Sequence, residues 1–455
     1  MPDYGHDLMF GTFITPSAHR GVQEALPASL RGKAIAPGDA AYPGVRHSYS
    51  WPGSPALVLR PENADEVVTA LAYVRAQELP LAVRSGGHGI SGRSTNDGGI
   101  VIDLAELNRV EVLDRASGRV RLEPGARWGE VARKLAPYGL AMSSGDSGGV
   151  GVGGLTTTGG IGYLARKHGL TIDHVTAVEM VLADGTQVRA DRDHHPDLFW
   201  AVRGAGGNFG VVTAFELEAY EVGDVVYAGL VVDATETAAF LRRWGRLVEE
   251  APREITSFLT LAPARGGNPP VAQMTLVYAG DEVEAAQDAL SPFLGAGPVL
   301  DQQAAVVPYP ELVRASGQRH EGHGLAEVRS GLVEHVTPEI AAGVEGMLHA
   351  GDTLFTQFRS VGGAVNDVPA QATAYPHRTQ NFSLLAATVP VLSARLNKRW
   401  EALREHLNGL YLSFETDTSP ERLADAFPEP ALSRLRALKQ IHDPDNVFNG
   451  NFPIR

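Results

Sequence analysis

RSGGHGISG, at residues 84–92, places a single histidine, His88, among four glycines directly after an apolar run at residues 79–83. A second glycine-dense stretch occupies residues 145–162. Glycines without a clear turn role usually mark places where the backbone approaches another group closely or takes a positive φ. Two such segments predict a large, flat, phosphate-bearing ligand held by backbone N–H groups. A nucleophilic imidazole beside that ligand suggests a covalent bond to it.

Further motifs follow this stretch in a fixed order. They are NDGGIVIDL at 96–104, GVGG at 151–154, GGIG at 159–162, RKHGL at 166–170, DLFWAVRG at 197–204, GGNFGVVT at 206–213, Lys439, and DPDNVF at 443–448. With these motifs the chain, from residue 55 onward, resembles the FAD-linked oxidases of the vanillyl-alcohol-oxidase type, in the branch of berberine bridge enzyme-like and 6-hydroxynicotine-oxidase-like proteins. The resemblance implies an α+β fold of two domains, a PCMH-type FAD-binding domain and a substrate domain with an antiparallel sheet.

Composition limits the classes of function. The chain has 455 residues, of which 44% are hydrophobic and 20% charged, as in ordinary globular proteins of two or three domains. Its net charge of −14 argues against nucleic acids and anionic membranes as partners. Because it has no cysteine, disulfides, thiolate metal sites and cysteine nucleophiles are excluded. No secretory signal or membrane-spanning apolar run is visible, so we expect a cytoplasmic protein. The sequence does not fix its oligomeric state.

Local patterning changes near Gly223. Before it, we expect short strands and hairpins at 56–60, 81–84, 100–104, 110–123, 175–190 and 211–220, and helices at 62–77, 128–138 and 198–202. After it, we expect strands at 225–232, 257–261 and 271–278, and helices at 236–250, 282–293, 394–408 and 430–441. This alternation predicts an antiparallel sheet with helices on one face. Since the resemblance implies that the last piece returns to the first domain, we assign 1–222 plus 410–455 to an FAD-binding domain and 223–409 to a substrate-binding domain.

The resemblance gives His88 a specific role. It implies a bond from an imidazole nitrogen to the flavin 8α carbon, with non-covalent FAD as the alternative. Many relatives place a cysteine at Ser147 for a second bond, which a serine cannot form, so we expect a single link. Val150 occupies a position that resembles the family's oxygen gate, where a small branched residue is typical of oxidases. Alternatively, Val150 merely packs.

The second glycine stretch also satisfies a dinucleotide-binding pattern. GVGVGG at residues 149–154 formally matches GxGxxG, which needs a buried strand before it and a helix after it. Residues 142–147 make a poor strand, and Gly159, Gly160 and Gly162 should weaken a helix. We therefore reject a nicotinamide site and expect a backbone cradle for the FAD pyrophosphate.

The predicted cofactor contacts come from both glycine stretches and from later segments. Asn451 matches a family asparagine near the flavin, although Phe452-Pro453 departs from the usual polar pair. The predicted cofactor-binding residues are Arg84, Ser85, Gly86, Gly87, His88, Gly89, Gly92, Gly145, Ser147, Val150, Gly151, Gly153, Gly154, Gly159, Gly162, Gly169, Val211, Val212 and Asn451.

Fewer residues mark the substrate side. Gln357 stands where relatives often carry a catalytic glutamate, and glutamine cannot act as a base. Arg359 shares a strand face with Gln357 and could bind an anionic or phenolate oxygen, or be an ordinary ion-pair partner. Tyr411 stands where a family tyrosine often faces the flavin. We therefore take Tyr411, Gln357 and Arg359 as candidate catalytic residues.

A metal site has little support. His320 and His323 flank Glu321, but no third ligand lies at a diagnostic spacing. We expect ordinary loop histidines there and no bound metal.

The leading hypothesis is an FAD-dependent oxidase of a small organic substrate, which the family precedent extends to natural-product intermediates. We expect a hydride to pass from a C–H bond next to O or N to flavin N5, with O₂ as the acceptor that yields hydrogen peroxide. A dehydrogenase with another acceptor and a flavin-bearing binding protein without turnover stay open. A metal-dependent hydrolase is the weakest alternative.

Overall fold

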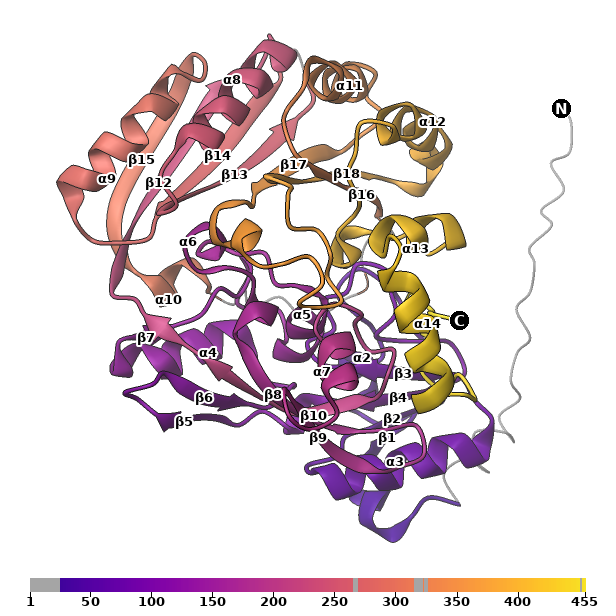
Figure 1. Ribbon diagram of the computed structural model, residues 1–455. Coiled ribbons are helices and arrows are strands. Elements are labelled where there is room, and N and C mark those ends of the chain that lie inside the picture. The colour runs from indigo at the N-terminus through magenta and orange to yellow at the C-terminus, as the bar shows by residue number, and fades with distance from the viewer. Residues whose placement is uncertain (1–24, 265–268, 315–321, 323–325, 451) are drawn as a thin grey trace, which may run out of the picture.

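The computed structural model describes residues 25–264, 269–314, 322, 326–450 and 452–455. Its lower region in Figure 1 is built around small sheets from the first half of the chain, and its upper region around one large sheet. The last helices, drawn in yellow, run back down beside the lower region. Among the described residues, no helix combines the length and the apolarity that crossing a bilayer requires.

The first sheet leads directly into the RSGGHGISG stretch. Its strand order is β1 (Ala34–Ile35), β2 (Leu57–Leu59), β4 (Ile100–Asp103) and β3 (Leu81–Arg84). Both β2 and β3 run parallel to β4. Helix α3 (Ala64–Gln77) buries Val67, Leu71 and Val74, as its periodicity predicts. Because β3 ends at Arg84, this buried sheet fixes where the glycine stretch begins.

The second sheet is antiparallel throughout and contains both predicted hairpins. Its order is β5 (Val110–Asp114), β6 (Arg119–Leu122), β10 (Val211–Glu218), β8 (Val175–Val181) and β9 (Gln187–Asp191). Helices α4 (Trp128–Leu135) and α7 (Pro196–Val202) contribute Trp128 and Trp200 to the same core. Between α4 and α7 lie β7 (Leu140–Ala141), α5 (Val152–Thr158) and α6 (Ala165–His168).

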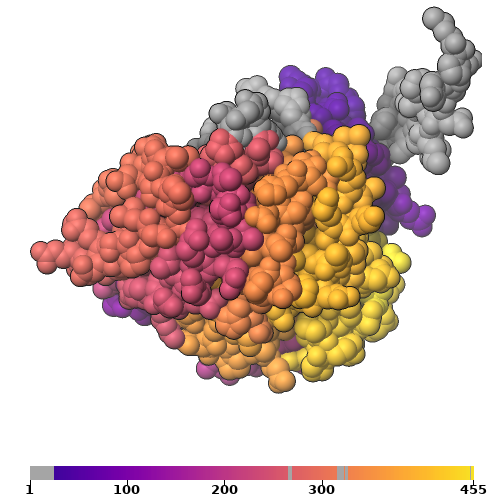
Figure 2. Space-filling model, turned by 90° about the horizontal axis from the view of Figure 1, so that it is seen from above, coloured from indigo at the N-terminus to yellow at the C-terminus, as the bar shows by residue number. Residues whose placement is uncertain are grey.

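The third sheet has seven antiparallel strands. Its order is β15 (Val299–Pro308), β12 (Asp224–Asp233), β14 (Val271–Tyr278), β13 (Ile255–Ala262), β17 (Phe355–Ser360), β18 (Phe382–Thr388) and β16 (Glu327–Val333). One face carries α8 (Thr237–Glu250), α9 (Val283–Leu290), α11 (Pro338–His349) and α12 (Ser393–Arg404), which lie side by side when seen from above (Figure 2). Trp244, Phe358 and Trp400 lie in the core beneath the helices. The predicted fold class, α+β with an antiparallel sheet in the second half, is confirmed.

The C-terminal segment packs against the lower region. Helices α13 (Pro420–Ala426) and α14 (Ala431–His442) end the chain's regular structure. On α14, the buried Lys439 pairs with Asp443 and donates to the carbonyls of Asn208 and Phe448. β11 (Tyr220–Glu221) pairs with β7, and β12 starts at Asp224. The division into 1–222 plus 410–455 and 223–409 stays our proposal.

One local expectation is wrong. A helix, α5, does follow the GVGVGG stretch, with Gly151 at its N-cap. Gly159 and Gly160 have φ of +147° and +89° and end this helix rather than interrupt it. Burial of Val152 and Thr156 outweighs the weak propensity of the glycines. The strand before the stretch, β7, has two residues and pairs antiparallel with β11, so no βαβ unit surrounds the motif.

Three predicted helices end earlier than expected. The helix expected at 282–293 ends at Leu290 and continues as a 3₁₀ turn. The helix expected at 128–138 becomes a 3₁₀ turn from Ala136 onward. The helix expected at 394–408 ends at Arg404, and the chain then turns through Gly409, whose φ is +108°.

Candidate functional site

A cavity with an empty volume of about 1630 Å³, counted with the space open to solvent at its mouth, lies beside both glycine stretches. We call its lining within residues 85–91 and 145–154 the glycine wall, and its lining at residues 411–414 the aromatic wall. Thirteen of the predicted site residues line the cavity: Ser85, Gly86, Gly87, His88, Gly89, Gly145, Val150, Gly151, Gly153, Gly154, Val211, Val212 and Tyr411.

The two glycine stretches touch at Gly86 and Gly151. A Cβ on either residue would lie far inside van der Waals contact with the backbone nitrogen of the other. Arg127 ties the stretches together, since its Nη1 donates to the carbonyls of Gly86 and Gly149, each at 2.5 Å. Burial lowers the pKa of Arg127. Ser85 Oγ, from the first stretch, accepts a hydrogen bond from Gly153 N of the second at 3.1 Å.

The glycine wall also leaves room for a ligand at its surface. No atom lies within 4 Å of the position that a Cβ would take on Gly89, Gly154 or Gly207, and all three residues line the cavity. A methyl group at these points would enter the open space. A flat ligand could therefore approach the backbone closely, and this cradle fits FAD.

His88 lies on this wall with its ring stacked on Tyr49, at 4.9 Å between centroids. Its Nε2 is 2.8 Å from the position of a Cβ on Gly149, and Ser147 Oγ is 3.9 Å from the same point. Ser147 does not line the cavity, but its hydroxyl and the imidazole both lie within 4 Å of that position.

Other predicted cofactor residues stand behind the walls. Arg84 forms a buried ion pair with Asp103 at 2.9 Å. Gly159 packs against the ring of Tyr411, and Gly162 against the backbone of Gly145. Gly92 lies against Trp51 and Gly169 against Asp173. These glycines let the walls pack, while Asn451 falls outside the described residues.

Tyr411 belongs to the aromatic wall, but its hydroxyl is engaged. Its Oη accepts a hydrogen bond from Gly160 N at 2.9 Å. Its ring meets Phe414 edge-on at 5.1 Å and Tyr375 at 6.3 Å. The tyrosine therefore links the aromatic wall to the backbone that follows α5.

Gln357 and Arg359 both lie on β17 and neither lines the cavity. Gln357 donates to Thr260 Oγ1 on the neighbouring strand at 3.1 Å. Arg359 forms an ion pair with Asp146 at 2.7 Å, and its guanidinium lies 4.1 Å from the ring centroid of Phe414. Of the two alternatives for Arg359, the structure shows an ion pair. Its partner Asp146, which sequence reasoning missed, lines the cavity.

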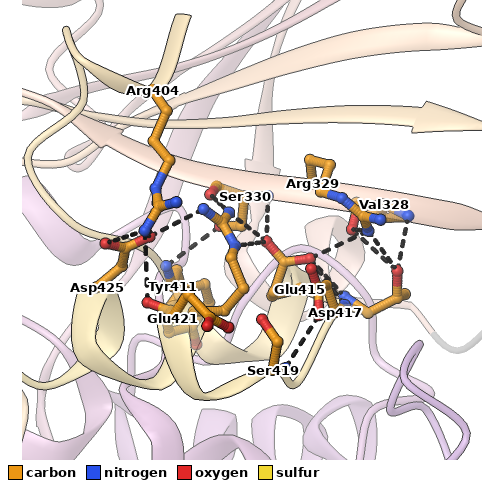
Figure 3. Close-up of polar contacts among 12 residues, drawn as sticks. Val328, Arg329, Ser330, Arg404, Tyr411, Glu415, Asp417, Ser419, Glu421 and Asp425 are labelled. Carbon is orange, nitrogen blue, oxygen red and sulfur yellow. Dashed lines mark hydrogen bonds and ion pairs between the residues drawn. The ribbon is translucent and has the colours of Figure 1, made fainter. Parts of the chain in front are cut away.

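A buried charge cluster fixes the aromatic wall from behind. Glu415, fully buried, accepts hydrogen bonds from Ser330 N and from the guanidinium group of Arg329 (Figure 3). It also accepts one from the guanidinium group of Arg422. The carboxylate thus anchors residues 411–414 to β16. A lone glutamate in the sequence gives no sign of this burial, so the cluster was not predictable.

Arg93 was also missed. It lines the cavity and donates to the carbonyl of Gly450 at 2.6 Å. Burial lowers its pKa to about 10. Its place one residue beyond RSGGHGISG is the only sequence feature that could have drawn attention to it.

Metal binding gains no support from the geometry. Within the described ranges, no group of three His, Cys, Asp or Glu side chains is arranged to hold an ion. His320, Glu321 and His323 lie outside those ranges.

Comparisons with known proteins agree with a cavity that holds FAD. Residues 55–191 match the model of an FAD binding domain. (R)-6-hydroxynicotine oxidase of Paenarthrobacter nicotinovorans is 28% identical over 459 residues, covering 94% of this chain and 98% of that protein. An FAD-linked oxidoreductase of Bacillus subtilis is 28% identical over 87% of this chain and 90% of its own length.

Solved structures show the same fold over nearly the whole chain. The crystal structure of 6-hydroxy-D-nicotine oxidase from Arthrobacter nicotinovorans has a TM-score of 0.83 and 26% identity, covering 95% of this chain and 99% of that one. A berberine bridge enzyme-like protein of Physcomitrella patens, at 19% identity and a TM-score of 0.84, covers 96% of this chain and 99% of that one. At that identity the likeness shows the fold alone.

Proposed function

We propose that this chain belongs to the FAD-linked oxidoreductases of the vanillyl-alcohol-oxidase and berberine bridge enzyme-like family. Within that family, we propose that it is an oxidase of a small organic substrate. The bond attacked is a C–H next to oxygen or nitrogen, and O₂ is the final acceptor, giving hydrogen peroxide. The open space over Gly89, Gly154 and Gly207, beside His88, carries this proposal. Bound FAD supplies the hydride acceptor there.

The glycine wall is the proposed FAD site. Backbone N–H groups of the stretches that meet at Gly86 and Gly151 hold the pyrophosphate. His88 forms a single bond to the flavin, since Ser147, whose hydroxyl also lies within 4 Å of the Cβ position on Gly149, cannot supply a second. Val150 lines the cavity, in keeping with a role in oxygen access.

The substrate binds at the aromatic wall in this proposal. Tyr411 reaches the cavity directly, whereas Arg359 stands behind its lining, against Asp146 and Phe414. Gln357 does not line the cavity and bonds to Thr260. These residues come from segments 357–359 and 411–414, which supports substrate binding between the lower and upper regions. A cytoplasmic location stays a prediction.

Retention of the flavin tests the cofactor assignment. The purified protein should be yellow, and acid precipitation should leave the pigment in the pellet. The H88A variant should release its flavin into the supernatant. Colourless protein contradicts the FAD proposal, and flavin that stays with precipitated H88A contradicts attachment at His88.

Turnover tests the reaction. Peroxide should form with at least one member of a panel of secondary amines, including (R)-6-hydroxynicotine, alcohols and oligosaccharides. Anaerobic addition of that compound should bleach the flavin, and air should restore its colour within the turnover time. Slow reoxidation would instead indicate a dehydrogenase, and a flavin that no compound reduces would indicate a binding protein.

A further inference from the structure

Asp146 is the only cavity-lining residue, among those that the structure describes, with a carboxylate side chain. It belongs to the glycine wall, directly before Ser147, whose hydroxyl, like the His88 imidazole, lies within 4 Å of the Cβ position on Gly149. Its side chain is 30% exposed. A ligand in the cavity therefore meets a negative charge at this point.

Arg359 fixes the orientation of that carboxylate. Its Nη2 donates to Asp146 Oδ2 at 2.7 Å. Arg359 itself is only 7% exposed, and its guanidinium lies 4.1 Å and 5.3 Å from the ring centroids of Phe414 and Phe258. Because rings enclose the arginine and the carboxylate lines the cavity, a ligand meets Asp146 and not Arg359.

The second oxygen of Asp146 is left for a ligand. Within the described part of the chain, Oδ1 accepts no hydrogen bond, whereas Oδ2 is held by Arg359. A carboxylate oxygen in this state is an acceptor only, so it selects partners with N–H or O–H donors. It repels anions.

β17 therefore does not supply a carboxylate of its own at Gln357, where relatives often carry a catalytic glutamate. Gln357 is tied to Thr260, whereas Arg359, two positions along on the same strand face, holds Asp146 of the glycine wall. The carboxylate is supplied by the glycine wall and is oriented from the sheet.

We propose that Asp146 is the residue that contacts the donor group of the substrate, that Arg359 is its positioning residue, and that the substrate is an amine or alcohol rather than a carboxylate or phenolate. This inference rests on the proposed oxidase function. Oxidation of such a carbon breaks one C–H bond and one O–H or N–H bond and forms C=O or C=N. Bound FAD would take the hydride, and Asp146 accepts the remaining proton, which then passes to solvent.

Ligand binding to the oxidised holoprotein tests the proposal without a known substrate. Benzylamine, benzyl alcohol and benzoate share a ring and differ in charge, and each should perturb the visible flavin spectrum when bound. We expect the affinity order benzylamine, then benzyl alcohol, then benzoate. In D146N, benzylamine should bind about ten- to a hundredfold more weakly, and benzoate should bind better because Arg359 loses its partner.

Matched variants separate the effect of the position of the Asp146 carboxylate from the effect of its charge. D146E should recover part of the benzylamine affinity. R359K should keep the ligand order, and R359M should reduce the preference for benzylamine over benzyl alcohol, a ratio that general loosening would not change. D233N, which removes a partly exposed carboxylate on β12 with the same change of net charge, should match the unmodified protein in its ligand binding.

The outcomes also distinguish the two proposals. Three results with a yellow protein would overturn the role of Asp146 and leave the flavin assignment intact. The first is tighter binding of benzoate than of benzylamine, and the second is no spectral response to benzylamine. The third is that the D146N and D233N variants behave alike. A colourless protein overturns the proposed function first.

Discussion

The glycine wall and the aromatic wall enclose one cavity but are held in different ways. In the glycine wall, backbone packs on backbone where Gly86 meets Gly151, and Arg127 bonds to carbonyls on both sides. In the aromatic wall, side chains form the surface, and buried polar groups such as Glu415 hold them from behind.

This difference determines what a substitution can break. A side chain added to the glycine wall meets either a neighbouring backbone or the open cavity. A side chain changed behind the aromatic wall leaves the surface residues in place but removes their anchor. The first wall should therefore respond to added volume, and the second to lost charge or hydrogen bonds.

The largest effect is expected behind the aromatic wall. Glu415→Gln removes the fully buried carboxylate that Arg329 and Arg422 share, and leaves them only their less buried partners Glu327 and Asp425. Breaking a buried ion pair costs ~3–5 kcal/mol. Urea unfolding monitored by tryptophan fluorescence should show a loss of this size. Glu401→Gln, at an exposed pair with Arg404, should change the free energy of unfolding by less than ~0.5 kcal/mol. Equal losses in both variants would contradict the anchoring role.

A pH dependence should come from the same side of the cavity. His377 is buried next to Tyr375, with its Nε2 3.0 Å from Ala426 O, and burial lowers its pKa to about 4. The unfolded chain, with a histidine pKa of about 6.5, binds a proton in this range that the fold does not. Stability should therefore fall as the pH drops from about 6.5 to about 4, by up to ~3 kcal/mol.

The variant His377→Gln isolates this contribution. Its free energy of unfolding should depend less on pH over that range than that of the unmodified protein. Burial also lowers the pKa of His168 to about 4. His168 should therefore keep part of the pH dependence of the free energy of unfolding in this variant. His349→Gln, at an exposed position on α11, should keep all of it, and a slope in His377→Gln equal to that of this control would refute the assignment.

Added volume in the glycine wall should have a smaller effect on stability. Gly151→Ala places a methyl group against the backbone of Gly86, and such overpacking costs ~1–3 kcal/mol. The variant should also lose flavin, since the two stretches must separate. Thermal unfolding and the ratio of flavin to protein absorbance measure both effects. Gly32→Ala, where no atom lies within 4 Å of a Cβ, should alter neither.

Sequence reasoning located the glycine wall because its constraint is local. Glycines in RSGGHGISG and GVGVGG are required by contacts that a Cβ would block, as at Gly86 and Gly151. The fold class followed from strand patterning such as that of β14, which matches the expected residues 271–278. The error at α5 arose because propensity was applied to a helix that tertiary burial stabilises.

The aromatic wall was only partly predictable because its partners lie far apart in the chain. Tyr411 was found from its resemblance to a family position, but its contact with Gly160 spans 251 residues. Arg359 was found while Asp146, 213 residues away, was not. Nothing in the sequence marks Asp146 as cavity-lining, since a single aspartate in a polar stretch is usually solvated. Strands β15, β16 and β18 were also missed, although the sheet order places them around β17 and β12.

The smallest change to stability should come from Gly154→Ala, and it gives the sharpest test of the glycine wall. A Cβ there meets no atom within 4 Å and enters the cavity. Since Gly154 lies within α5 and alanine has the better helix propensity by ~1 kcal/mol, the folded protein should be as stable or slightly more so. Its flavin content should nevertheless fall, because the methyl group occupies space that the cofactor needs. A variant that keeps both full stability and full flavin content would show that the cofactor lies elsewhere along this wall. A stable variant with little flavin would show that the cofactor needs the open space at Gly154. Gly151→Ala cannot make this distinction, because it changes the space for the ligand and the packing of the backbone together.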